Sequence, residues 1–138
     1  MTWAATATPA VRQDVSFLLE VAAEVAGSLV ERGASQPFGV VMDHEGTVTV
    51  RSEVLPPEAD EWAAVSTLAD SVQAHADRLR AALLVASTGD ALDPRARIFG
   101  DHREGRPFAG WLEYVLVIGA PARVRSVSVD PMESGLFT

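Results

Sequence analysis

A regular apolar stripe between residues 11 and 29 constrains the fold of this chain more than any other feature. Its members recur at spacings of 4, 3, 4, 3 and 4 residues, which places them on one side of an α-helix. They are Val11, Val15, Leu18, Ala22, Val25 and Leu29. Thr8 precedes Pro9, and this pair is typical of an N-cap followed by the first helical residue. The pattern therefore predicts a helix from Pro9 to Arg32.

The spacing of the stripe leaves two partners open for this helix. A helix that packs on a β-sheet buries a stripe of this width. The strict alternation of four and three also fits a heptad pattern over about three repeats, which makes the same helix of a second copy the alternative partner. Self-association through this helix therefore stays open at this point.

Two short runs after this helix are typical of a β-hairpin. Residues 37–43 are mostly apolar, and residues 47–52 alternate valine with polar side chains, as a half-buried strand does. Gly46 closes the turn between them, where a positive φ favours glycine. We therefore predict two antiparallel neighbouring strands.

A second helix is predicted from Glu58 to Arg80. Its apolar positions keep helical spacing, and its ends complement the helix dipole, because the first turn is acidic and the last turn is basic. The continuous apolar run of residues 81–87 then predicts a buried central strand. Further strands are predicted over residues 95–100 and 111–118, with an edge strand over residues 122–129.

These elements predict one α+β domain that spans residues 1–138. The order is α-β-β-α-β-β-β, followed by the edge strand over residues 122–129, with a mostly antiparallel sheet and the two long helices on one face of it. Residues 1–8 are expected to be a loose N-terminus. Residues 130–138 are expected to form a tail that Leu136 and Phe137 hold against the body, or else a loose one.

Charge and composition narrow the classes of partner. The chain of 138 residues carries a formal net charge of −8 and contains no cysteine. The missing thiols exclude disulfide scaffolds, iron–sulfur centres and thiolate zinc sites. The acidic balance disfavours nucleic acid and favours a basic protein partner. The sequence shows no signal-peptide pattern and no membrane-length apolar run, so we expect a cytoplasmic protein with no membrane partner and no cofactor.

The hairpin of residues 37–46, with the sequence PFGVVMDHEG, resembles the opening motif of a family of small uncharacterised bacterial proteins that are common in actinobacteria. In that family a proline–phenylalanine strand leads into an aspartate-x-aspartate-glycine turn. A helix, a strand and a charged hairpin that ends in glycine follow, and residues 101–105 match that hairpin. Glu45 stands where the family pattern has aspartate. The resemblance implies a small α+β fold over residues 10–138 and carries no activity or site residue.

Two aspartate–histidine pairs, Asp43–His44 and Asp101–His102, fall in the two predicted hairpin loops. If both loops lay at one end of the sheet, their imidazoles and carboxylates would suit zinc or a harder divalent ion. Aspartate and histidine are also common in exposed turns, and no spacing connects the two pairs. We therefore predict solvent-exposed turns and no metal site. His75 lies beside the stripe of the second helix and is predicted to be a packing residue.

Arginines alternate along two of the predicted strands. Arg95 and Arg97 share one face of their strand, and Arg123 shares a face with Arg125. If these strands flank a common neighbour, four guanidinium groups gather on one sheet face and form a site for a small anion or carboxylate. The other interpretation is a solvated face on which acids such as Glu113 are interleaved with the arginines.

Two further pairs of residues are candidates for contact with a protein partner. Trp111 and Tyr114 are three positions apart on one strand and therefore lie on opposite faces. One of them is expected in the core, and the other is a candidate contact anchor. Glu20 and Glu24 share the polar face of the first helix, which forms either a solvated surface or an acidic patch for a partner.

The sequence offers no catalytic arrangement that is stronger than a structural explanation of the same residues. We therefore expect a non-enzymatic, acidic binding or accessory domain, of an immunity or regulator type, whose partner is a protein or a second copy. The alternative is a small-molecule enzyme or ligand-binding domain that uses the arginine-lined sheet face. An apolar pocket in which Arg95 or Arg97 meets His75 or His102 would favour this alternative, whereas a flat, water-facing arginine face would remove it.

Overall fold

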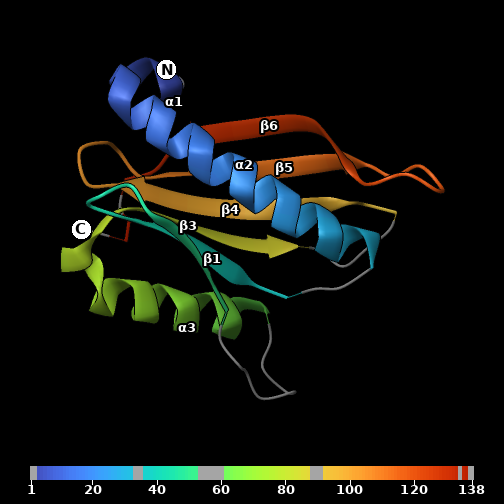
Figure 1. The fold of residues 1–138 in the computed structure, drawn as a ribbon, viewed down its shortest axis with the longest axis horizontal. Helices are drawn as coiled ribbons and strands as arrows, with labels where there is room; N and C mark the ends of the chain where they lie inside the picture. The colour runs from blue at the N-terminus through green and yellow to red at the C-terminus, as the bar shows by residue number, and fades with distance from the viewer. Residues whose placement is uncertain (1–2, 33–35, 53–60, 88–91, 134, 137–138) are drawn as a thin grey trace.

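The structure is a computed structural model that describes residues 3–32, 36–52, 61–87, 92–133 and 135–136. These residues form a six-stranded antiparallel sheet in the order β2-β1-β3-β4-β5-β6 (Figure 1). The strands are β1 (Phe38–Asp43), β2 (Val48–Arg51), β3 (Leu79–Ser87), β4 (Arg95–His102), β5 (Phe108–Val115) and β6 (Arg123–Pro131). The helices are α1 (Trp3–Thr6), α2 (Pro9–Glu31) and α3 (Glu61–Ala74), with a 3-10 turn η1 (Ala76–Arg78) before β3. The α+β class, the single domain and the element order are as predicted.

The helix α2 is the one that the apolar stripe predicts. Its N-cap is Thr8, whose side-chain oxygen accepts a hydrogen bond from the backbone amide of Val11 at 3.3 Å. Val11, Leu18 and Ala22 of the stripe are completely buried against the sheet. Because the sheet covers this stripe, the stripe itself is not available to pair with a second copy.

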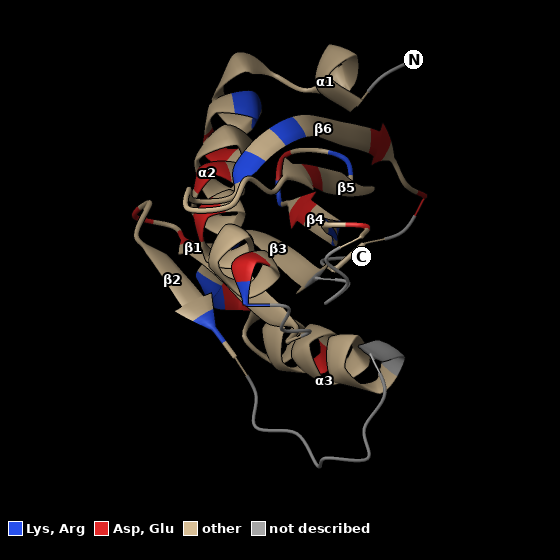
Figure 2. Ribbon diagram, turned by 90° about the vertical axis from the view of Figure 1, so that its right-hand side faces the viewer, with Lys and Arg blue, Asp and Glu red and all other residues tan. Residues whose placement is uncertain are grey.

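The two long helices lie on opposite faces of the sheet, which corrects the prediction that both lie on one face (Figure 2). The central strand β3 shows the reason. Leu83 and Val85 belong to the core beneath α2, whereas Ala82 and Leu84 belong to the core beneath α3. A strand that is apolar on both sides needs a cover on each side, so one helix packs on each.

The helix α3 ends earlier than the predicted helix of residues 58–80. It stops at Ala74, and β3 begins at Leu79 after the turn η1. Leu79 fits the apolar period of a helix, but the structure uses it as a buried strand residue of the core beneath α3. Arg80, predicted as the last helical residue, is the second residue of β3 and pairs with Asp14 of α2. The predicted helix start at residue 58 lies outside the described residues.

The strand β5 is shifted toward the N-terminus relative to the prediction. It spans Phe108–Val115, and the apolar residues that follow it form a turn in place of the predicted strand end. Ile118 in this turn is fully exposed. The predicted edge strand is present as β6 and continues to Pro131.

Both ends of the described chain are docked on the body. Residues 3–8, which we expected to be loose, include α1, and Trp3 is 4% exposed. Its ring centroid lies 4.8 Å from that of Phe108, and its indole Nε1 donates a hydrogen bond to the carbonyl of Arg106 at 2.7 Å. At the other end Leu136 packs against the core beneath α3, as predicted for the tail. Phe137, the other residue expected to hold the tail, lies outside the described residues.

The helix α3 covers only part of its side of the sheet. It packs mainly on β1 and β3 and contacts β4 at Phe99, and no helix among the described residues covers β5 and β6 from that side. We call this uncovered part the open sheet face. Its side chains include Arg95, Arg97, Trp111, Glu113, Arg123 and Arg125, and Phe99 lies at its border with α3.

Candidate functional site

The strand order meets the condition that the arginine site requires. β4 and β6 flank β5, so the two arginine-bearing strands share a neighbour. In the register of β4 with β5, Arg95 lies opposite Glu113 and Arg97 lies opposite Trp111. The guanidinium groups of β4 therefore lie on the same face as the side chains of β5 that point away from α2.

Trp111 is the centre of a stack of cations and aromatic rings. The guanidinium carbon of Arg95 lies 4.0 Å from the Trp111 ring centroid, and that of Arg97 lies 5.5 Å from it. Arg97 also lies 5.1 Å from the ring centroid of Phe99. An aromatic face attracts a guanidinium within about 6 Å through its quadrupole. The two rings therefore hold neighbouring cations on the open sheet face.

Two of the four predicted arginines are already neutralised by carboxylates. The Nε of Arg95 lies 2.9 Å from Asp93, and a terminal nitrogen of Arg125 lies 3.0 Å from Glu113. These pairs are partly exposed, and each contributes at most about 1 kcal/mol to stability. The four guanidinium groups thus share a sheet face but do not form one free cationic cluster.

Arg97 and Arg123 form no ion pair with any residue in the described part of the chain. Arg123 is exposed at the start of β6, opposite Val115. Arg97 is also exposed, but it belongs to the stack with Phe99 and Trp111. Arg97 is therefore a cation that the protein positions without neutralising it.

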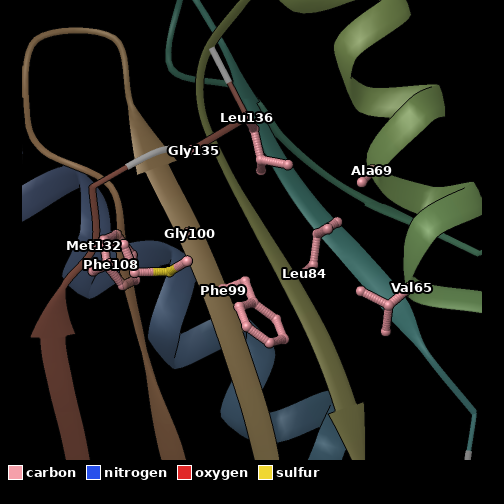
Figure 3. A pocket seen from close by; sticks show the side chains of 9 residues that line it. All are labelled: Val65, Ala69, Leu84, Phe99, Gly100, Phe108, Met132, Gly135 and Leu136. Carbon is pink, nitrogen blue, oxygen red and sulfur yellow. The ribbon is translucent and has the colours of Figure 1, made fainter. Parts of the chain in front are cut away.

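An apolar cavity of about 330 Å³ lies beside this stack, between α3 and the C-terminal segment (Figure 3). Its described lining consists of Val65, Ala69, Leu84, Phe99, Gly100, Phe108, Met132, Gly135 and Leu136. The volume falls at the lower end of the range for small-molecule sites. Phe99 lines the cavity and also carries Arg97 on its ring, so the cavity and the cation share a wall.

His102 does not join this site, and the prediction of an exposed turn around it is wrong. The strand β4 continues through Asp101 and His102, and both residues are only 2% exposed. The Nε2 of His102 lies 2.8 Å from a carboxylate oxygen of Asp14, while its Nδ1 accepts a hydrogen bond from the amide of Glu104 at 3.0 Å. Because Nδ1 is an acceptor, Nε2 carries the proton that is donated to Asp14. Both ring nitrogens are occupied, so His102 has a structural role in α2–β4 packing.

The first aspartate–histidine pair forms the turn that was predicted for it. Asp43 accepts hydrogen bonds from the backbone amides of Glu45 and Thr47, each at 2.9 Å, and Gly46 has a φ of 90°. His44 is exposed, and its Nε2 bonds to the carbonyl of Asp77 at 2.9 Å. Within the described ranges, no three His, Cys, Asp or Glu side chains are placed to hold a metal ion.

His75 is a partly buried residue, as predicted, and it shares no described pocket with the candidate arginines Arg95 and Arg97. Its Nδ1 bonds at 3.0 Å to the backbone carbonyl of Ser71, one turn earlier in α3. It lines a separate depression with residues of β1 and β2. The described residues therefore do not bring Arg95 or Arg97 together with His75 or His102, the convergence that would favour a small-molecule enzyme or ligand-binding domain, but an apolar cavity does lie beside Arg97.

Trp111 and Tyr114 lie on opposite faces of β5, as their spacing predicts. Trp111 is half-buried on the open sheet face, and Tyr114 is 4% exposed in the core beneath α2. Tyr114 therefore offers no surface for a partner. Glu20 and Glu24 are exposed on α2, in the solvated position that was one of their two predicted roles.

Tyr114 makes the alkaline stability of the protein testable. Its hydroxyl donates a hydrogen bond to the carbonyl of Ala23 at 2.7 Å, and burial raises its pKa well above the ordinary value of 10. The chain has one tyrosine, no lysine and no cysteine, so other side chains do not titrate near that pH. The unfolded chain loses this proton near pH 10 and the folded chain retains it, so stability is full below pH 10 and decreases above it.

We predict that the free energy of unfolding, measured by urea denaturation, decreases with pH between pH 10 and pH 11. The slope should approach its limit for one proton, about 1.4 kcal/mol per pH unit. Tyr114→Phe should remove this slope and reduce stability at pH 7 by about 1 kcal/mol, the value of one hydrogen bond. An equal alkaline slope in both proteins would show that Tyr114 is not the responsible group.

Comparison of the chain with protein-family models, curated proteins and solved structures gives no match. The resemblance to small actinobacterial proteins therefore stays a prediction. None of the described helices combines the length and the apolar character that a membrane span requires.

The cavity is the part of the site that sequence reasoning missed. Its walls come from α3, β3, β4, the start of β5 and the C-terminal segment, most of which are far apart in the chain. One wall of the cavity is predictable from the sequence, because Leu136 is expected to hold the C-terminal tail against the rest of the domain. Phe99 gives no such signal, since a single aromatic residue between Ile98 and Gly100 is typical of an ordinary strand.

Proposed function

We propose that this chain is a non-catalytic binding domain for an anion with an apolar tail, of which a medium-chain carboxylate is the simplest example. The observation that carries the proposal is the double role of Phe99. One ring lines the apolar cavity and also supports Arg97, which has no ion pair in the described chain. This proposal combines the non-enzymatic binding domain with the arginine-lined anion site, the two functions that the sequence suggests.

The charged side chains along β4 favour one orientation of a bound ligand over the other. Asp101, Phe99, Arg97 and Arg95 follow one another at alternate positions of the strand. Neighbours in this row are separated by roughly 7 Å, the length of two strand residues. A ligand whose tail fills the cavity at Phe99 would therefore place its anionic head at Arg97. The reverse orientation would bring the head toward the acidic side chain of Asp101.

The tail and the head have different energetic roles. Burying each methylene group stabilises the complex by about 0.8 kcal/mol, which is roughly a fourfold gain in affinity. An exposed arginine–carboxylate pair contributes at most about 1 kcal/mol. The apolar tail would therefore supply most of the affinity, and Arg97 would select the anion and orient it.

The chemistry of the cavity supports binding over catalysis. Its described lining contains no nucleophile and no titratable side chain. Asp14 and His102, which form a buried carboxylate–imidazole pair, belong to the packing of α2 on β4. The pair serves that packing, because both ring nitrogens of His102 are already bonded.

Isothermal titration with decanoate and decanol, which share a tail and differ in charge, tests this proposal. We expect decanoate to bind more tightly than decanol, and hexanoate to bind more weakly than decanoate. Arg97→Gln should weaken decanoate binding by about fivefold and leave decanol unchanged, because it removes one exposed charge–charge contact. Arg106→Gln removes the same charge from an exposed loop position and should change neither affinity.

A second pair of variants locates the tail. Ala69→Phe places a ring in the cavity and should abolish binding of both ligands. Ala74→Phe adds the same ring at an exposed position of the same helix and should preserve binding. Equal affinities for decanoate and decanol would show that the protein does not recognise the anionic head group, and this would contradict the proposal. Unchanged binding in the Ala69 variant would remove the cavity from the proposal.

A further inference from the structure

The edge strand β6 is long and open, in contrast to the edge at the other side of the sheet. β6 has nine residues, whereas β2 has four. Proteins usually protect an exposed edge by short length, charged side chains such as lysine, proline or a β-bulge. β6 contains no lysine, its single proline is its last residue, and beyond its one bulge at Arg125 it pairs regularly with β5 from Ser126 to Pro131. An edge of this kind is a template for pairing with another strand.

The register with β5 shows which way the side chains of β6 point. Val124, Val127 and Val129 lie opposite Tyr114, Leu112 and Gly110, so all three valines are on the α2 side. Val124 and Val127 are 41% and 49% exposed. Ser126, Ser128 and Asp130 point to the other side, together with Arg123 and Arg125. The edge thus has an apolar row on one side and a polar row on the other.

The sequence of β6 is complementary to itself when a second copy runs antiparallel to it. A two-fold axis at Val127 sets that residue against its own counterpart and sets Ser126 against Ser128. The pairing of β5 with β6 has a bulge opposite Glu113 and Tyr114, where β6 has one extra residue, Arg125. Arg125 is therefore also left unpaired in the two-fold arrangement. The next pairs that keep each side chain on its own side of the sheet are Val124 with Val129 and Arg123 with Asp130.

We infer that β6 is the interface through which two copies of this chain join their sheets into one continuous antiparallel sheet. Charge complementarity argues for a second copy as the occupant. Figure 2 shows that β6 is basic near its start and acidic at its end, so antiparallel pairing brings opposite charges together twice. Two copies that each carry a net charge of −8 repel one another in general, which makes such local attraction necessary for association.

The exposed turn before β6 fits the same arrangement. Val117 and Ile118 in this turn are 55% and 105% exposed. In an antiparallel pair the start of one β6 lies beside the end of the other, near α1, because α1 packs against the Phe108–Pro131 end of that strand pair. The turn of one copy would therefore lie next to α1 of the second copy.

Light scattering coupled to size exclusion, over a concentration series of the full chain, tests this inference. We expect a dimer whose dissociation constant increases on the order of tenfold or more with either Arg123→Asp or Asp130→Arg, since each creates two like-charge contacts. The double variant should recover the wild-type constant. An equimolar mixture of the two single variants should form a heterodimer more tightly than either variant forms a homodimer.

Urea denaturation of each variant distinguishes loss of folding from loss of association. Arg123 and Asp130 are exposed, so we expect their substitution to leave the fold of each copy intact. Val127→Lys places a charge at the two-fold axis and should give a folded monomer. A wild-type chain that stays monomeric at its highest soluble concentration would overturn the inference. A dimer that none of these substitutions weakens would overturn it as well, since its interface would lie elsewhere.

Discussion

Gly110→Ala is expected to detach β6 from β5 and to lower the free energy of unfolding by about 3 kcal/mol or more. A Cβ atom at this position would lie 1.7 Å from the carbonyl oxygen of Ser128 and 2.7 Å from its carbonyl carbon. Both atoms belong to the backbone of β6, so no side-chain rotation can relieve the contact. Urea denaturation measures the loss, and hydrogen exchange should show that the amides of β6 lose protection first.

Gly39→Ala is the matched control for this substitution. Gly39 is buried in β1, but a Cβ atom there would have its nearest contact at 3.5 Å, with a side-chain carbon of Leu84. We expect this variant to stay within about 1 kcal/mol of the wild type. If both glycine variants lost the same stability, glycine entropy and not the close approach of β6 would be the cause.

Asp14→Ala is expected to cost about 3 kcal/mol of stability, because it leaves a buried imidazole without its acceptor. Asp14 receives the Nε2 proton of His102 at 2.8 Å and pairs with Arg80 at 3.2 Å. The His102 side chain is 1% exposed, so water cannot replace the lost carboxylate without a local opening. The carboxylate thereby connects α2 to β3 and β4.

Two variants separate this effect from a general loss of charge on the helix. Glu24→Ala removes an exposed acid from α2 and should change stability by less than about 0.5 kcal/mol. Asp14→Asn retains an oxygen acceptor and should lose less stability than Asp14→Ala. Equal losses for Asp14→Ala and Glu24→Ala in chemical denaturation would show that the buried contact has no net value.

The periodicity of apolar residues predicts an element correctly where that element depends mainly on residues of its own segment. The stripe of α2 needs only one sheet face to pack on, and Thr8 provides its cap within the same segment. The end of α3 was not predictable in this way, because Leu79 suits the apolar period of a helix and the pattern of a strand equally well. Leu79 belongs to a strand because it pairs with Asp43 in β1, and such long-range pairing leaves no local sequence signal.

The position of the helices shows how one prediction constrained another. A buried central strand over residues 81–87 implies that both faces of the sheet are covered, and this excludes two helices on one face. The alternation of Leu83 with Leu84 between the two cores shows this consequence in the structure. The apolar run thus predicts a central strand and also requires one covering element on each face of it.

Spacing alone identified half of the candidate site. Alternating positions placed Arg95 and Arg97 on one strand face, and the strand order then set them beside Trp111. The cavity required the fold itself, since α3 and the C-terminal segment meet over Phe99 only after the chain has folded. The burial of His102 is not predictable from its residue type, because aspartate and histidine are typical of turns, whereas here they end a buried strand.

Isotope-filtered NMR of the ¹³C-labelled protein with unlabelled decanoate examines the proposed site at the level of single contacts. The terminal methyl group of the ligand should show nuclear Overhauser effects to Leu84, Val65 and Leu136 in the cavity. The methylene next to the carboxylate should show them to the ring of Phe99 and not to the cavity methyl groups. Effects confined to the α2 side of the sheet or to the exposed turn at Ile118, or the reverse orientation of the chain, would overturn the account.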